Sequence, residues 1–237
     1  MYFIVQFLTV LIVGYAMIHL NRLTVPDINK IGRPMLSRLG GVAILAGIAV
    51  TYFFSPEMLP VIFASGIAFA IGIVDDVRVM SGWFKPVLMV LPAVPLVLLS
   101  YDFQPSIFYM LFSMAYVTGM SNSVNAIDVL NGVASGTIMI GSVALAVVLF
   151  ISGGPWEHAA VLAGVAAAFL ILHFPPAKIF PGDSGTLVLG TAYAAIALIG
   201  GLGWGLNNFA GNYDMSGADY LQVMAKKFNI GNSADPA

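Results

Sequence analysis

Hydrophobic residues in this chain form long unbroken stretches, and the polar residues gather in the short segments between them. An apolar stretch of roughly 20 residues crosses the hydrocarbon core of a bilayer as an α-helix. Only helices and closed barrels satisfy their backbone polar groups there, and runs without alternation favour helices. We predict an all-α, polytopic transmembrane helical bundle of about eight spans. The segments are 2–20, 40–55, 59–74, 86–100, 106–123, 132–152, 158–173 and 186–206.

Composition agrees with a bilayer as the solvent. Hydrophobic residues make up 59% of the 237 residues and charged residues 8%, whereas soluble domains carry about 25% charged residues. The net charge of −2 argues against a nucleic-acid partner. The absence of cysteine excludes disulfides, thiolate chemistry and cysteine-based zinc sites.

The chain divides into one transmembrane domain, residues 1–206, and a polar tail, residues 207–237. The first apolar segment has neither a basic start nor a small-residue cleavage pattern, so we interpret it as a membrane helix rather than a signal peptide. In the tail, residues 220–228 form a short amphipathic stretch that suits an interfacial helix or a frayed end.

Lysine and arginine residues predict the orientation. Alternate loops contain Arg22, Lys30, Arg33, Arg38, Arg78, Lys85 and Lys178, and the opposite loops 55–58, 101–105 and 153–157 contain none. The positive-inside rule places the basic loops in the cytoplasm and the N-terminus outside. With eight spans, the tail with Lys226 and Lys227 also lies outside.

The acidic residues of the basic side form the candidate chemistry. They are Asp27, Asp75, Asp76, Asp128 and Asp183. The acids of the opposite side are isolated loop residues, which we interpret as solvated: Glu57, Asp102 and Glu157.

The Asp75-Asp76 pair lies where the third span leaves the membrane. Adjacent carboxylates at such a point repel each other and lose hydration, and a divalent cation removes both costs. Magnesium prefers one or two carboxylates together with phosphate oxygens of a substrate. The alternative is a solvated helix end.

A polar segment, residues 122–132, lies between two apolar spans. On a helix, Asn122, Asn125 and Asp128 would share one face, because they follow each other at intervals of three. A polar stripe in a membrane requires partners, which are either neighbouring helices or a polar ligand.

The segment 174–186 contains three prolines and a Gly-Asp-Ser-Gly turn. Asp183 could serve only as the N-cap of the last span. A helix N-terminus also binds anions, however, and Lys178 adds positive charge nearby. This combination suits a metal–diphosphate substrate. His19, His158 and His173 share neither a loop nor a side, which argues against a histidine metal site.

In these three segments the chain resembles the polyprenyl-phosphate N-acetylhexosamine-1-phosphate transferases of glycosyltransferase family 4. The resemblance covers the order and topology of the chain to about Gly200. It rests on three motifs: Asp75-Asp76, Asn122/Asn125/Asp128/Asn131-Gly132 and Phe180-x-Gly182-Asp183. Arg38-Leu39-Gly40-Gly41, at the start of the second span, is also consistent with it. Asn131 and Trp83-x-Lys85 look like the dolichyl-phosphate enzymes, whereas Asp128 follows the bacterial pattern.

The resemblance implies an enzyme of the cell membrane with its active site on the cytoplasmic face. It would transfer N-acetylglucosamine-1-phosphate, or a related N-acetylhexosamine-1-phosphate, from a UDP-sugar to a polyprenyl or dolichyl phosphate, releasing UMP. This is the first step of lipid-linked glycan assembly, for protein glycosylation or cell wall biogenesis. Residues 1–206 would be the catalytic domain. The partners implied are UDP-N-acetylhexosamine, the lipid phosphate, membrane lipid and a second copy of the chain in a homodimer.

Site roles are also implied by the resemblance. The catalytic residues would be Asp75, Asp76 and Asp183. Asp76 and Asp183 would bind Mg²⁺, with Mn²⁺ as an alternative, although either Asp75 or Asp76 could hold the metal while the other acts on the lipid phosphate. The substrate-binding residues would be Lys85, Asn122, Asn125, Asp128, Asn131 and Lys178.

Two other functions fit parts of the sequence. A small membrane transporter would place polar residues near mid-membrane and show repeat symmetry between its halves. Here the acids cluster at one surface and the halves show no clear repeat, which favours the enzyme. Family members usually have about ten spans and a further cytoplasmic loop, so an inactive, truncated member is the other alternative.

Overall fold

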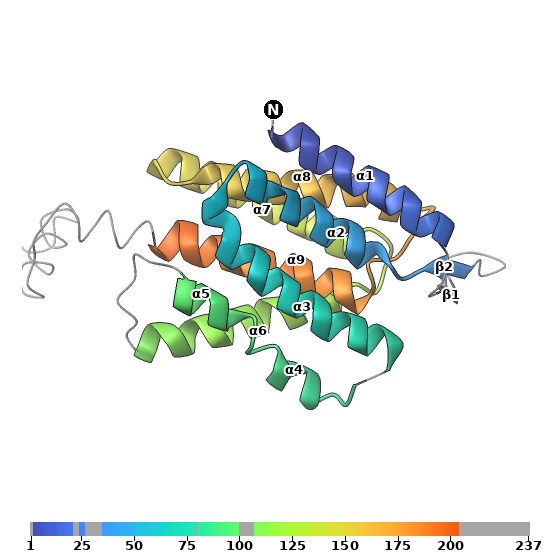
Figure 1. Ribbon diagram of the computed structural model, residues 1–237, viewed down its shortest axis with the longest axis horizontal. Helices are drawn as coiled ribbons and strands as arrows, with labels where there is room; N and C mark the ends of the chain where they lie inside the picture. Colours follow the sequence, from blue (N-terminus) through green and yellow to red (C-terminus); the bar gives the residue numbers. More distant parts are fainter. Residues whose placement is uncertain (1, 21–23, 27–34, 79, 100–106, 204–237) are drawn as a thin grey trace, which may run out of the picture.

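A computed structural model describes residues 2–20, 24–26, 35–78, 80–99 and 107–203 of the chain. Within these ranges the protein is a bundle of helices lying alongside one another (Figure 1). The elements are α1 (Tyr2–Leu20), β1 (Thr24–Pro26), β2 (Met35–Ser37), α2 (Gly40–Ala49), η1 (Val50–Phe53), η2 (Pro56–Met58), α3 (Leu59–Val77), α4 (Phe84–Leu88), α5 (Ala93–Leu99), α6 (Ile107–Ile127), α7 (Val133–Ser152), α8 (Trp156–His173), α9 (Gly182–Ile196) and η3 (Ala197–Gly203).

The prediction of an all-α membrane bundle is confirmed. Five helices of the described part are long and apolar enough to cross a membrane: Phe3–Leu20, Pro56–Val77, Val133–Ser152, Trp156–His173 and Gly182–Gly200. The predicted segment 40–55 corresponds to α2, which continues into η1, and the predicted segment 106–123 corresponds to the 21-residue helix α6. The tail 207–237 and Asp27 lie outside the described residues.

Two local features differ from the prediction. The segment 86–100 is not one helix, because α4 ends at Leu88 and α5 begins at Ala93. Pro92 explains the break, since its ring would clash with the carbonyl of the residue four positions earlier, Leu88. The second feature is an antiparallel pairing of β1 with β2, which pairs Thr24 with Ser37 across the loop after α1.

Helix α9 lies at the centre of the bundle, and nearly all of its residues are buried (Figure 1). It packs against α3, α6 and α2, and its small residues permit this close packing. A Cβ atom on Gly190 would lie 2.6 Å from the Cα atom of Ser121 on α6. Large exposed apolar side chains instead cover α7, including Ile140, Val147 and Ile151, and suit contact with lipid.

The start of α9 meets the end of α3 at the same end of the bundle as the β1–β2 pair (Figure 1). Gly72 of α3 makes this approach possible, since a Cβ atom there would lie 2.4 Å from the Cα atom of Ser184. Any side chain at position 72 would therefore push the two helices apart.

We expect Gly72→Ala to lower the apparent melting temperature in detergent by several degrees, because inserting atoms into a packed contact costs about 1–3 kcal/mol. Gly66→Ala on the same helix is the matched control, since a Cβ atom there would meet nothing within 4 Å. Its melting temperature should be unchanged or higher, because alanine is a better helix former than glycine. Equal melting temperatures for the two variants would contradict this packing.

Candidate active site

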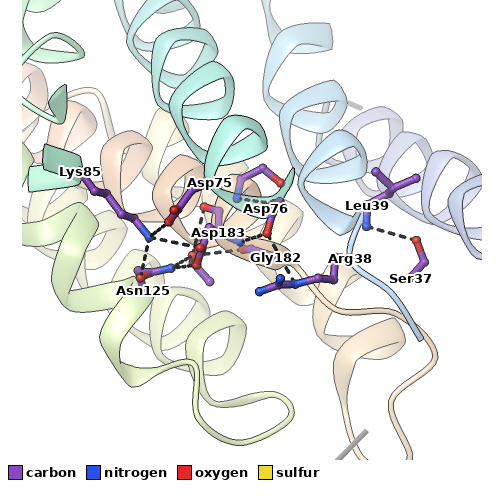
Figure 2. Close-up of polar contacts among 11 residues, drawn as sticks. Ser37, Arg38, Leu39, Asp75, Asp76, Lys85, Asn125, Gly182 and Asp183 are labelled. Atoms are coloured by element: carbon purple, nitrogen blue, oxygen red, sulfur yellow. Dashed lines mark hydrogen bonds and ion pairs between the residues drawn. The ribbon is translucent and has the colours of Figure 1, made fainter. Parts of the chain in front are cut away.

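The carboxylate of Asp76 caps the N-terminus of α9 from the neighbouring helix α3 (Figure 2). Its two oxygens accept hydrogen bonds from the backbone N–H groups of Asp183, at 2.9 Å, and of Ser184, at 3.0 Å. The side chain has 0% exposure. These N–H groups have no partner within their own helix, and the helix dipole favours a negative charge at this position.

Gly182 lets the Asp76 carboxylate reach these N–H groups. Its φ angle of 67° lies in the left-handed region, and a Cβ atom there would lie 2.6 Å from Asp76 Oδ2. Because α9 begins at Gly182, Asp183 lies in its first turn. The cap is therefore Asp76, and the Asp183 side chain is left for other contacts.

Lys85 joins two of the predicted catalytic acids. Its ammonium nitrogen lies 2.7 Å from Asp75 Oδ2 and 3.3 Å from Asp183 Oδ2, and it donates a hydrogen bond of 3.1 Å to Asn125 Oδ1. Lys85 comes from α4, Asp75 from α3, Asn125 from α6 and Asp183 from α9, so four helices meet at one ammonium group (Figure 2).

Asn125 completes this group, which we call the Lys85 cluster: Asp75, Lys85, Asn125 and Asp183. Its amide nitrogen donates to Asp183 Oδ1 and to Thr186 Oγ1, the latter at 2.8 Å. Thr186 in turn donates to the carbonyl of Gly182 at 3.2 Å. The sequence interpretation missed Thr186, although its position three residues after Asp183 places it on the same side of α9.

The other residues of the polar segment lie in different surroundings. Asn122 donates to the carbonyl of Thr118 in its own helix at 2.8 Å. Asp128 was expected on the same helical face, but α6 ends at Ile127, so Asp128 lies in the turn before α7, as does Asn131. Of this stripe, Asn125 is the residue that bonds directly to Asp183.

Asp128 faces a buried histidine rather than the Lys85 cluster. Its Oδ1 lies 3.9 Å from Nε2 of His173, whose Nδ1 lies 3.3 Å from the hydroxyl of Ser135. Burial, together with the charge of Asp183, raises the pKa of Asp128 to about 7, and the charge of Arg38 partly opposes this shift.

Two charged residues have partners that the sequence did not predict. The Lys178 ammonium lies 3.4 Å from the hydroxyl of Tyr15 and 5.5 Å from the centre of its ring, so it contacts α1 rather than Asp183. Glu57, interpreted as an isolated solvated acid, lies 3.3 Å from Nε2 of His158.

The Lys85 cluster has the chemistry to hold a divalent cation together with a phosphate-bearing substrate. Within the described ranges, no three His, Asp or Glu side chains gather closely enough to form a complete metal site. Asp75 and Asp183 nevertheless supply two carboxylates, both in contact with Lys85. One or two carboxylates are what a protein typically contributes to a Mg²⁺ site when phosphate oxygens provide other ligands. Asp76 is a poor ligand in this arrangement, because both of its oxygens accept backbone N–H groups of α9 and its side chain has 0% exposure. In Asp75, one oxygen accepts the Met80 N–H and the other contacts the ammonium of Lys85.

Comparison with known proteins identifies relatives for most of the chain. The family model described as Glycosyl transferase family 4 matches residues 58–201. A Sulfolobus acidocaldarius protein named UDP-N-acetylglucosamine–dolichyl-phosphate N-acetylglucosaminephosphotransferase is 30% identical over 73% of this chain and 62% of its own length. A Bacillus subtilis protein named undecaprenyl-phosphate N-acetylglucosaminyl 1-phosphate transferase is 31% identical over 84% of this chain and 62% of its own length.

A third relative matches a shorter part. The phospho-N-acetylmuramoyl-pentapeptide-transferase of Chlamydia muridarum is 35% identical over 47% of this chain and 35% of its own length. The chain thus spans less than two thirds of the length of these curated relatives.

The raised pKa of Asp128 predicts a pH-dependent stability. Between pH 3.8, the ordinary pKa of this carboxyl, and about pH 7, the folded protein holds a proton that the unfolded chain has released. The Asp128 carboxyl therefore makes the fold less stable as pH rises through this range. The slope is at most about 1.4 kcal/mol per pH unit. In EDTA, Asp128→Asn should therefore gain melting temperature relative to the wild type between pH 5 and pH 7.5.

Glu157→Gln, a change to an exposed carboxylate of α8, is the control and should show no such gain. A difference between Asp128→Asn and the wild type that stays constant with pH would show that the Asp128 carboxyl does not titrate in this range.

Proposed function

The chain belongs to glycosyl transferase family 4, and from this premise we propose that it transfers N-acetylglucosamine-1-phosphate from UDP-N-acetylglucosamine, or from a related UDP-sugar, to a polyprenyl or dolichyl phosphate. The observation that carries the proposal is the Lys85 cluster, in which four helices bring two carboxylates, an ammonium and an amide together at one end of a membrane bundle.

The reaction requires positioning and control of charge more than covalent chemistry by the protein. An oxygen of the lipid phosphate attacks the β-phosphorus of the donor. A new P–O–P linkage to the lipid forms, the original bond between the α- and β-phosphates breaks, and UMP leaves. In this scheme Asn125 fixes the Asp183 carboxylate, and Lys85 holds Asp75 and Asp183 in place until the phosphates arrive.

We further propose that Asp75 and Asp183 hold the divalent cation, Mg²⁺ or Mn²⁺, that the family resemblance implies. This replaces the expectation of Asp76 with Asp183, since Asp76 is buried as the cap of α9. When bound, the cation would neutralise charge on the diphosphate. Lys85, which bridges the same two carboxylates, could then move its ammonium toward a phosphate oxygen.

The surroundings of the Lys85 cluster suit a reaction at a membrane surface. Lys85 belongs to the cluster, Arg38 pairs with the adjacent Asp76, and Arg78 follows the end of α3. We propose that this end faces the cytoplasm, following the positive-inside rule. Beside Lys85, the side chains of Trp83 and Val87 have 89% and 66% exposure. An exposed tryptophan at this position suits the lipid interface, through which the lipid phosphate would arrive.

The position of the Lys85 cluster favours a transferase over a small transporter. Asp75 lies in the last turn of α3 and Asp183 in the first turn of α9, so both acids are at an end of the bundle rather than at mid-membrane. Such a surface site can receive one substrate from lipid and another from water.

We expect Asp183→Asn and Asp75→Asn to reduce cation-dependent UMP release from UDP-N-acetylglucosamine on the order of 100-fold or more, because each removes a charge aimed at the reacting phosphates. Release of UMP by the purified full chain with a polyprenyl phosphate measures this directly. Glu57→Gln, at a carboxylate that pairs with His158 instead, is the control and should retain activity. Near-wild-type turnover by either aspartate variant would refute its assigned role.

A further inference from the structure

The backbone around Arg38 is fixed against the segment that leads into α9. The Phe180 N–H donates to the Ser37 carbonyl at 2.8 Å, the Gly40 N–H to the Phe180 carbonyl at 3.0 Å, and the Gly41 N–H to the Pro181 carbonyl at 2.9 Å. Arg38 lies between these bonds, in the turn from β2 to α2. Its side chain therefore starts from a rigid position beside the N-terminus of α9.

The guanidinium of Arg38 is held at one side and accessible at the other. Its Nε lies 3.6 Å from Asp76 Oδ1, and the side chain has 32% exposure (Figure 2). Because this contact is made through Nε, it orients the guanidinium without using its terminal nitrogens. Asp76 also accepts two backbone hydrogen bonds from α9. In the described part of the chain, Asp76 is the acid with which Arg38 forms an ion pair.

Two lysines and the first N–H groups of α9 already have partners of their own. Lys85 is 13% exposed and contacts Asp75, Asp183 and Asn125. Lys178 contacts Tyr15. The first N–H groups of α9, which would otherwise bind an anion, are bonded to Asp76. Of the two cations that pair with the aspartates of this end, Arg38 is therefore more accessible to an entering diphosphate than Lys85.

We propose that Arg38 is a phosphate-binding residue of the site, with its terminal nitrogens donating to non-bridging oxygens of the donor diphosphate while its Nε stays on Asp76. The inference rests on the proposed function for the identity of the donor. A planar guanidinium forms two parallel hydrogen bonds to a phosphate, which the ammonium of lysine cannot reproduce. The bound donor is thus connected through Arg38 and Asp76 to the N-terminus of α9.

The test compares Arg38→Lys and Arg38→Gln with the matched variants Arg78→Lys and Arg78→Gln, at an exposed arginine beyond the end of α3. Calorimetry on the full chain measures binding of UDP and of uridine. Both Arg38 variants should weaken UDP binding about tenfold or more, because charge-assisted hydrogen bonds are lost. Uridine binding, and UDP binding by the Arg78 variants, should not change.

Steady-state kinetics then separates the two phosphate-bearing substrates. The KM for UDP-N-acetylglucosamine should rise in Arg38→Lys, while the KM for the polyprenyl phosphate stays the same. A rise for the lipid phosphate alone would overturn the assignment to the donor. Unchanged UDP affinity in Arg38→Lys, or an equal loss for uridine, would overturn phosphate binding by Arg38.

The calorimetry also distinguishes failure of this inference from failure of the proposed function. If UDP binding depends on Arg38 but the wild-type protein releases no UMP, the phosphate site stands and the transferase activity does not.

Discussion

The buried carboxylate of Asp76 is the interaction on which the arrangement of the site depends. A buried charge is costly unless it is paired and hydrogen-bonded. Here two backbone N–H groups of α9, the positive end of its dipole and the guanidinium of Arg38 surround one carboxylate. The contact joins α3 to α9 at a point where Gly72 and Gly182 leave room for it. It fixes the first turn of α9, and with it the direction of Asp183.

The two adjacent aspartates consequently perform different tasks. Neighbouring residues of a helix point about 100° apart, because a turn contains 3.6 residues. Asp76 faces the backbone of α9, whereas Asp75 faces Lys85, at 2.7 Å. Helix geometry thus separates a carboxylate that caps α9 from one that contacts Lys85 and the Met80 N–H, and Lys85 connects the latter to Asp183.

Part of this arrangement could be predicted from the sequence. Apolar run lengths located the helices, and the side shared by Asp75, Asp128 and Asp183 indicated where the site would form. The tasks of Asp75 and Asp76 could not be separated, because they depend on how α3 is rotated against α9. The contact of Lys178 with Tyr15 could not be predicted for a similar reason, since it depends on the packing of α1. Asp128 was placed on a helical face because no glycine or proline marks the end of α6 at Ile127.

The most direct test of this account is the apparent melting temperature of Asp76→Asn in detergent, measured without divalent cation or substrate. An amide at this position cannot accept both backbone N–H bonds, and an unsatisfied buried donor costs about 1–3 kcal/mol. We predict a decrease of roughly 5 °C, and a smaller change for Glu57→Gln, whose carboxylate is 61% exposed. An unchanged melting temperature in Asp76→Asn, combined with loss of UMP release, would contradict the account and assign Asp76 to the chemistry.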